Sequence, residues 1–153
     1  MIRFHTTAVL MMVLLFPAAA LADLSGTATM TPGTYMDFGN GNGVGVTPIG
    51  DIGFDGTNLT FLGKAKGAVF PPPSTGAAVY SGIDLTTLES LASQESPNPI
   101  PTSVMPVDSI LGIKTNRGNV TKILVTAISA SSLTFQFQTF LVFTPTINSV
   151  ANN

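Results

Sequence analysis

The sequence predicts a mainly β fold: an antiparallel β-sandwich or flattened barrel with one short helix, after a cleaved signal peptide. Two observations carry this prediction. Short apolar runs are separated by Asn-Gly and Asp-Gly pairs, which mark tight turns between strands. A long segment near the C-terminus alternates apolar and polar residues with a period of two, as a half-buried strand does.

Short strands are expected in the first half of the chain. The Gly-rich segment 39–45 is expected to be a hairpin tip rather than a dinucleotide-binding loop, because Thr47 and Pro48 follow it instead of a helix. A triple proline at 71–73 should stop the last strand of this half. The expected strands span residues 35–38, 51–54, 59–62 and 65–70.

The C-terminal third is expected to form an antiparallel meander. Its strands span 110–115, 120–128 and 133–143, with turns at 116–119 and 129–132. In the last strand Phe135 and Phe137 lie on the apolar face, whereas Gln136 and Gln138 lie on the polar face.

This last strand should be central to the fold. It carries no charge, Pro or Gly, and left exposed it would pair with other chains. Its neighbours, or a partner copy, must therefore cover it. Phe140 and Val142 interrupt the polar face, so we expect its far end to be covered on both faces.

One stretch has helical periodicity. Leu85, Leu88 and Leu91 recur on one face, and either Asp84 or Thr86 would cap the helix, Thr86 through a capping box with Glu89. The helix should end before Pro97. Four prolines then make 97–107 an extended connector within one domain.

Residues 1–22 have the three parts of a secretory signal. A short n-region holds Arg3, a nine-residue apolar run covers 8–16, and the small Ala20 and Ala22 precede the expected cleavage site. The run is shorter than the roughly 20 apolar residues of a membrane span. We therefore expect a secreted protein, periplasmic or extracellular, in which residues 23–153 form a single β-rich domain.

The mature chain is poor in charged and reactive side chains. Once Arg3 has left, five basic residues face eight acidic ones, and only 9% of the whole chain is charged, where about a quarter is typical. The chain therefore has no basic patch for nucleic acid or for an anionic membrane. It has no Cys, and its only His, His5, lies in the leader, so disulfides and Ser-His, Cys-His or His-zinc sites are excluded.

The C-terminal third carries a resemblance. The segment 113–125 runs through Thr115-Asn116-Arg117-Gly118 into Lys122-Ile123-Leu124-Val125, and an aromatic strand ending in Thr139-Phe140 follows. Together with Asp37-Phe38 and Asp51-Ile52, it resembles a loose group of uncharacterised secreted bacterial β-domain proteins. The chain departs from that group at Val120 and Thr121. The resemblance implies a fold and a compartment but no activity, so it assigns no functional residue.

Four residues are candidate ligand contacts. Tyr35 and Tyr80 are the polar aromatics, and sugar-binding sites generally use aromatic rings; Asp37 and Asp51 flank turns. Asp residues beside turns commonly accept hydrogen bonds from their own backbone, which is the alternative role for both carboxylates.

Two chemical alternatives draw on the same carboxylates. Asp37, Asp51, Asp55 and Glu89 would be the acids and bases of a carboxylate-based hydrolase, but their spacing does not demand a catalytic pair. Loop oxygens of Asp37, Asn40, Asn42, Asp51 and Asp55 suit Ca²⁺ but match no defined calcium loop. We expect no catalytic residue, no cofactor and no metal site.

Two functions remain open. The first is a non-catalytic structural or interaction domain that associates with its own copies, favoured by the low charge and the small polar side chains. The second is a module that binds a glycan or another cell-surface polymer. Polar side chains that converge in a concavity on the folded surface would favour the second.

The exported protein is expected to begin at Asp23, because Ala20 and Ala22 fit the two small-residue pockets of signal peptidase. Intact-mass spectrometry of the exported protein measures this directly. A mass that includes Met1, or one that places the N-terminus inside the folded domain, would contradict the leader assignment.

Overall fold

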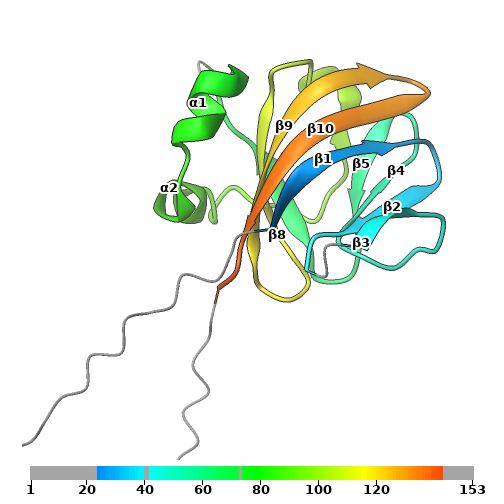
Figure 1. Cartoon of the computed structure of the whole chain (residues 1–153), viewed down its shortest axis with the longest axis horizontal. Helices are drawn as coiled ribbons and strands as arrows, with labels where there is room; N and C mark the ends of the chain where they lie inside the picture. The colour runs from blue at the N-terminus through cyan, green and yellow to red at the C-terminus, as the bar shows by residue number, and fades with distance from the viewer. Residues whose placement is uncertain (1–23, 40–41, 73, 143–153) are drawn as a thin grey trace, which may run out of the picture.

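The computed structural model describes residues 24–39, 42–72 and 74–142, which form two antiparallel sheets of five strands each (Figure 1). The mainly β sandwich-like fold predicted from the sequence is confirmed. The predicted leader and its cleavage site lie outside the described residues, as does Phe143 at the end of the predicted last strand.

Sheet A has the strand order β1-β10-β9-β8-β6, with all neighbours antiparallel. The last three strands of the chain form the predicted meander, with turns at the expected places. The strands of sheet A are β1 (Leu24–Met30), β6 (Lys66–Val69), β8 (Ile110–Lys114), β9 (Val120–Ser129) and β10 (Ser132–Phe140).

Sheet B has the order β3-β2-β4-β5-β7 and is also antiparallel. Three of its strands match the expected strands within a residue or two. The strands of sheet B are β2 (Thr34–Asp37), β3 (Asn42–Gly45), β4 (Ile52–Phe54), β5 (Asn58–Phe61) and β7 (Ile100–Pro101).

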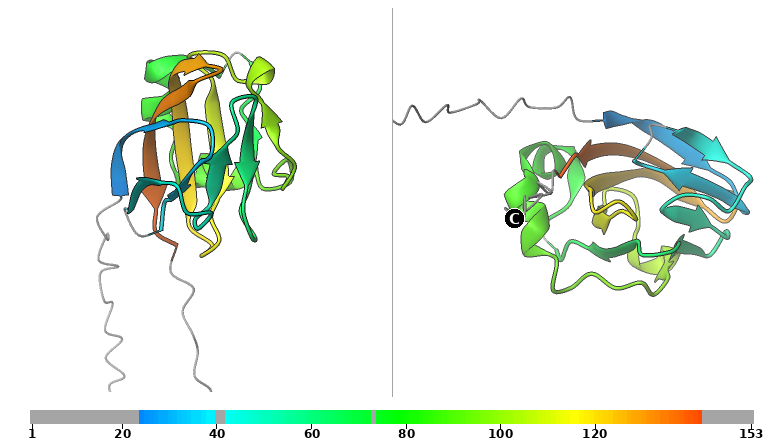
Figure 2. Two further views of the ribbon diagram at one scale, coloured as in Figure 1. Left: turned by 90° about the vertical axis from the view of Figure 1, so that its right-hand side faces the viewer. Right: turned by 90° about the horizontal axis from the view of Figure 1, so that it is seen from below.

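Figure 2 shows the arrangement of the strands from two further sides. The main core contains buried side chains from both sheets. Phe38, Phe54 and Phe135 are almost completely buried in it, and the rings of Phe38 and Phe135 lie 6.4 Å apart in a tilted arrangement. Side chains alternate along each strand, so every second residue of sheet A points into this core.

A second core lies on the other face of sheet A, beneath helices α1 (Gly76–Gly82) and α2 (Leu85–Ser90) (Figure 1). Leu88 and Leu91 pack there against strand residues such as Ile110 and Leu124. Phe140 and Val142 join the same cluster, so the prediction that the far end of the last strand is covered on both faces is confirmed.

The predicted helix forms as α2, and its cap is Asp84, whose carboxylate accepts hydrogen bonds from the Thr87 N–H (2.8 Å) and Thr87 Oγ1 (2.7 Å). Thr86 does not cap it. Helix α1 was not expected, because Gly76, Gly82 and the β-branched Val79 are poor helix formers. It is held from outside, by packing on sheet A.

Strand β10 is central, as predicted: it pairs with β9 on one side and with β1 on the other. The pairing with β9 shifts register between Thr134 and Phe135, where Thr126 is the extra residue. Such a bulge increases the local twist of the sheet.

Three strands differ from the sequence expectations. The segment that includes β1 was given no strand. Strand β3 takes the second half of the Gly-rich 39–45 run, which therefore is a paired strand and not only a hairpin tip. Strand β7 and the short 3₁₀ helix Thr102–Val104 interrupt the expected extended connector at 97–107.

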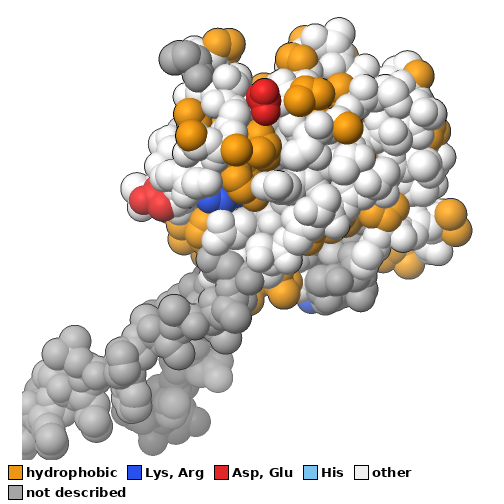
Figure 3. All heavy atoms as spheres, turned by 45° about the horizontal axis from the view of Figure 1, so that its top comes forward, with side chains coloured by type: hydrophobic (Ala, Val, Ile, Leu, Met, Phe, Trp, Pro, Cys, Tyr) orange, Lys and Arg blue, Asp and Glu red, His pale blue; other side chains and the backbone are white. Residues whose placement is uncertain are grey.

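The surface carries few charges. On the face in Figure 3, most exposed atoms are backbone or uncharged polar side chains, with scattered apolar ones between them. The surface apolar side chains include the strongly exposed Val46 and Ile49.

Side-chain substitutions in β10 should change the free energy of unfolding by amounts that depend on the face of the strand. Phe135 is completely buried, so Phe135→Ala should cost about 3–5 kcal/mol of unfolding free energy, through lost burial and a cavity. Phe137 faces Gly26, which has no side chain to cover it, and it is half-buried, so Phe137→Ala should cost less, roughly 1.5–3 kcal/mol.

The matched control is Gln136→Lys on the exposed face, which should cost well under ~1 kcal/mol. Urea unfolding of the three variants measures all of these values. Equal costs for Phe135→Ala and Gln136→Lys would be incompatible with the burial described here.

Candidate functional site

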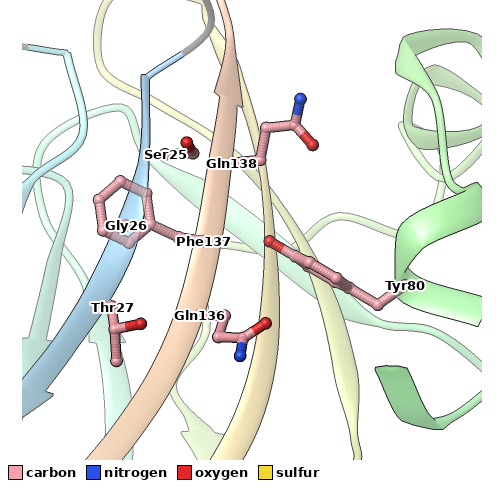
Figure 4. Close-up of a pocket in the computed structure, with 7 residues that line it drawn as sticks. All are labelled: Ser25, Gly26, Thr27, Tyr80, Gln136, Phe137 and Gln138. Carbon is pink, nitrogen blue, oxygen red and sulfur yellow. The ribbon is translucent and has the colours of Figure 1, made fainter. Parts of the chain in front are cut away.

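A polar hollow of about 420 Å³ lies on the outer face of sheet A, between strands β1 and β10 and helix α1 (Figure 4). It occupies the part of this face that the helices leave open. Its lining residues come from three separate segments of the chain: Ser25, Gly26, Thr27, Tyr80, Gln136, Phe137 and Gln138.

The strand alternation explains why these side chains face outward. Ser25 pairs with Gln138 and Thr27 with Gln136 across the β1–β10 ladder, so each pair shares the face opposite the core. Between these pairs Gly26 and Phe137 belong to the core face, where an added Cβ on Gly26 would meet the Phe137 ring at 3.2 Å. The missing side chain of Gly26 therefore leaves room for the Phe137 ring on the core face, and the two residues contribute the backbone floor between the outward-facing pairs.

Tyr80 forms the wall opposite the strands. Its ring extends from α1 toward β10, and its hydroxyl group lies between Gln136 and Gln138 (Figure 4). The residue is 9% exposed, so the ring is mostly covered and the polar end reaches the hollow. Burial raises the pKa of the Tyr80 phenol to about 12, so the hydroxyl stays protonated at physiological pH and can both donate and accept hydrogen bonds.

Lys122 fixes Tyr80 in this position. This lysine is 2% exposed, and its Nζ donates to the carbonyl oxygens of Tyr80 (2.8 Å) and Ile83 (2.7 Å) at the C-terminal end of α1. The same ammonium group lies 4.7 Å from the centre of the Tyr80 ring. A cation at a helix C-terminus stabilises the free carbonyls there, and here it also attaches α1 to sheet A.

The chemistry of the hollow is neutral. Its lining offers two amides, two aliphatic hydroxyls and one phenol, all of which can donate and accept hydrogen bonds. None of these seven described residues is charged. Such a surface can bind an uncharged ligand rich in hydroxyl or amide groups.

A second polar cluster, the Asp51 junction, lies at an end of the sandwich. The junction comprises Asp51, Asn116 and the backbone groups they bind. Asp51 is 2% exposed, and its carboxylate accepts hydrogen bonds from the N–H groups of Phe38 (2.9 Å) and Asn116 (2.7 Å). The Asn116 side chain then accepts from the Lys64 N–H (2.6 Å) and donates to the Gly50 carbonyl (2.6 Å).

The junction connects the ends of β2, β4 and β5 in sheet B with the β8–β9 turn in sheet A. Burial raises the pKa of the Asp51 carboxyl above its ordinary value of 3.8, and the nearby charge of Asp37 raises it further. The two N–H donors and Arg117 act in the opposite direction. The geometry is that of a structural carboxylate that holds loops together.

The four candidate contacts named from the sequence do not form one site. Asp37 and Asp51 are close enough to interact electrostatically at the junction. Tyr35 lies on the outer face of sheet B, where its ring covers Gly53. Tyr80 lies beyond sheet A, at the hollow.

The carboxylates considered for calcium are also apart. Asp51 and Asp55 lie at opposite ends of β4, and Asp55 is engaged within its own turn. A hydrogen bond from the Asn58 side chain, followed by bonds from Thr57, lowers the pKa of Asp55 to about 2. Within the described ranges, no three His, Cys, Asp or Glu side chains come together as metal ligands would.

No helix in the described part of the chain has the length and hydropathy needed to cross a membrane. No family model matches this chain, and no curated protein or solved structure is significantly similar to it. The resemblance to secreted bacterial β-domain proteins therefore stays a prediction.

The sequence pattern predicted that Gln136 and Gln138 share a polar strand face, but it did not predict that Ser25 and Thr27 of β1 lie beside them in the hollow. Ser25, Thr27 and Thr29 alternate with Gly26 and Ala28, and this period of two was the available signal. It is weak because all five side chains are small. Nothing local marked Lys122 as the residue that fixes Tyr80, because its partners are about forty positions away.

Replacing Asp51 should destabilise the fold in a pH-dependent way. In Asp51→Asn one acceptor oxygen becomes an NH₂ group facing a buried N–H, which should cost about 1–3 kcal/mol. Because the pKa of Asp51 is raised in the folded state, its titration adds to the free energy of unfolding, and this addition is complete below about pH 3.8. The addition is lost as the pH rises through the folded-state pKa.

The difference in free energy of unfolding between the wild type and Asp51→Asn should therefore become smaller as the pH rises from about 4 toward 7. The other titrating groups are the same in both proteins, so their effects cancel in this difference. Urea unfolding at several pH values measures this difference. A difference that grows with pH would show that the two N–H donors, and not burial, dominate the pKa of Asp51.

Proposed function

We propose that this chain is an exported, non-catalytic interaction domain that binds a neutral, hydroxyl-rich ligand, such as a glycan or another cell-surface polymer, in the polar hollow. The observation that carries the proposal is the convergence of five uncharged polar side chains from three chain segments around one concavity. A concavity in which a few polar groups converge is a candidate binding site.

The size and chemistry of the hollow support a carbohydrate. The hollow has a volume of about 420 Å³ and is wide open to solvent, so it would bind part of an extended ligand on the surface rather than enclose a whole one. Gln136 and Gln138 can each present an amide oxygen and an NH₂ group to adjacent hydroxyls of a sugar ring. Lys122, the cation beside the Tyr80 ring, is buried and bound to two carbonyls, so it offers no accessible charge to an anionic ligand.

The start of the fold supports export. Strand β1 begins at Leu24, directly after Asp23, the expected first residue of the mature protein. Removal of residues 1–22 therefore leaves every described element intact. The periplasm or the extracellular space is the proposed location.

The second candidate is a structural role through association of identical copies. The observation that favours it is the free edge of β1, which lies beside the hollow but uses backbone groups instead of side chains. A carboxylate-based hydrolase has less support, because the buried Asp51 is committed to two backbone N–H groups.

Ligand binding is tested by exposing the protein to an array of neutral oligosaccharides alongside sulfated and phosphorylated ones. We expect neutral glycans to be retained. Tyr80→Phe removes one hydroxyl from the hollow while keeping the ring over Lys122, and it should weaken binding about 2- to 10-fold, the value of one hydrogen bond.

Tyr35→Phe is the matched control, since it removes the same atom on the outer face of sheet B, and binding should not change. Gln136→Ala, at an exposed position in the hollow, should weaken binding without loss of stability. Retention of anionic glycans alone, or an equal effect of the two tyrosine variants, would refute the hollow as the site.

A further inference from the structure

β1 is an edge strand of sheet A, and β3 of sheet B approaches it without pairing with it. β1 has seven residues and, among the described strands, pairs only with β10. Its sequence, Leu24-Ser25-Gly26-Thr27-Ala28-Thr29-Met30, has no charge and no proline. Its register with β10 is continuous, without a bulge. Natural proteins normally protect such an edge with one of these three features, or by covering it.

The other three sheet edges are all protected. β6 is covered by the connector: Ser96 exchanges two backbone hydrogen bonds with Gly67, and Lys66 forms an ion pair at 3.2 Å with Glu95, whose side chain is 3% exposed. β7 has two residues, one of which is a proline without an N–H. β3 has four residues, and its pairing with β2 is irregular.

We propose that β1 pairs with β1 of a second copy of this chain, in antiparallel orientation about a two-fold axis, so that two A sheets join into one. A closed two-fold arrangement is the commonest form of self-association. The middle residue of β1 is Thr27, and a pairing centred there places Thr27 opposite Thr27 of the second copy. It also places Ser25 opposite Thr29 of the second copy.

The side chains of β1 fit such a pairing. The outer face would carry hydroxyl groups directly opposite one another, an arrangement that stabilises cross-strand pairs. Sheet A already uses it twice: Thr29 and Thr134 are joined through their hydroxyls at 2.9 Å, as are Thr121 and Thr139. Because β1 is uncharged, pairing two copies of it sets no like charges opposite each other, and this favours a second copy over a charged partner as the occupant.

The pairing would also extend the hollow. Ser25 and Thr27 line it from β1, so joining two β1 strands brings the hollows of both copies to one continuous face. A strand pair of this length buries less than the roughly 1,200–2,000 Å² of a stable interface, so the dimer should be weak and should form only at high protein concentration. The dimer does not depend on whether the hollow binds a glycan.

The chain has no cysteine, so single cysteines report the pairing directly. Opposed Cα atoms in an antiparallel pair are about 4.5–5.5 Å apart, within the range that a disulfide spans. Thr27→Cys in the chain from Asp23 to Asn153 should therefore give a covalent dimer under mild oxidation. The matched control, Gln136→Cys, is equally exposed on the neighbouring strand, and it should stay monomeric.

Sedimentation of the unmodified chain between about 10 μM and 1 mM supplies a measurement without substitution. Its mass should rise toward that of a dimer, and Thr27→Lys, which sets two charges opposite each other, should keep it monomeric while Gln136→Lys does not. A wild type that is monomeric throughout would overturn the proposal. A dimer that survives Thr27→Lys, or one that both lysine variants abolish, would instead place the interface elsewhere. Glycan binding that persists in a monomeric wild type would leave the function of the hollow standing while this pairing fails.

Discussion

The fold depends on covering β10. This strand runs from Ser132 to Phe140 without a charge, and a strand of this composition associates with other chains unless its faces and edges are occupied. β9 and β1 occupy its two edges, and sheet B occupies its core face. The helices cover only the far part of the remaining face, around Phe140.

The two candidate functional surfaces are the parts of sheet A that no other described element covers. Strand β1 pairs with one edge of β10, and β1 itself then becomes the edge strand of the sheet. The helices cover the outer face of sheet A as far as Tyr80, and beyond it Gln136 and Gln138 remain in contact with the hollow. Lys122 determines where the cover ends, because its two hydrogen bonds to α1 fix that helix on the sheet. The residues that hold α1 on the sheet, Lys122 and Tyr80, therefore also set the boundary of the proposed binding surface.

The sequence predicted the elements whose signal is local. The meander was predictable because its strands are long and alternate, and helix α2 because Leu85, Leu88 and Leu91 follow at helical spacing. The sequence left its cap open between Asp84 and Thr86. The hollow was not predictable, since Thr27, Tyr80 and Gln136 come together only through pairing across most of the chain. The Asp51 junction spans 65 positions in the same way, which is why its carboxylate could be taken for a ligand contact from the sequence.

Strand β1 covers one edge of β10 and leaves its own outer edge without a paired strand. Hydrogen–deuterium exchange of the dilute chain tests this most directly, because backbone N–H groups that are paired in a sheet exchange slowly and those facing solvent exchange fast. We expect slow exchange along the whole of β10, and slow and fast amides in alternation along Leu24–Met30. Uniformly fast exchange in β1 together with fast exchange at one edge of β10 would contradict it, since β10 would then be an open edge.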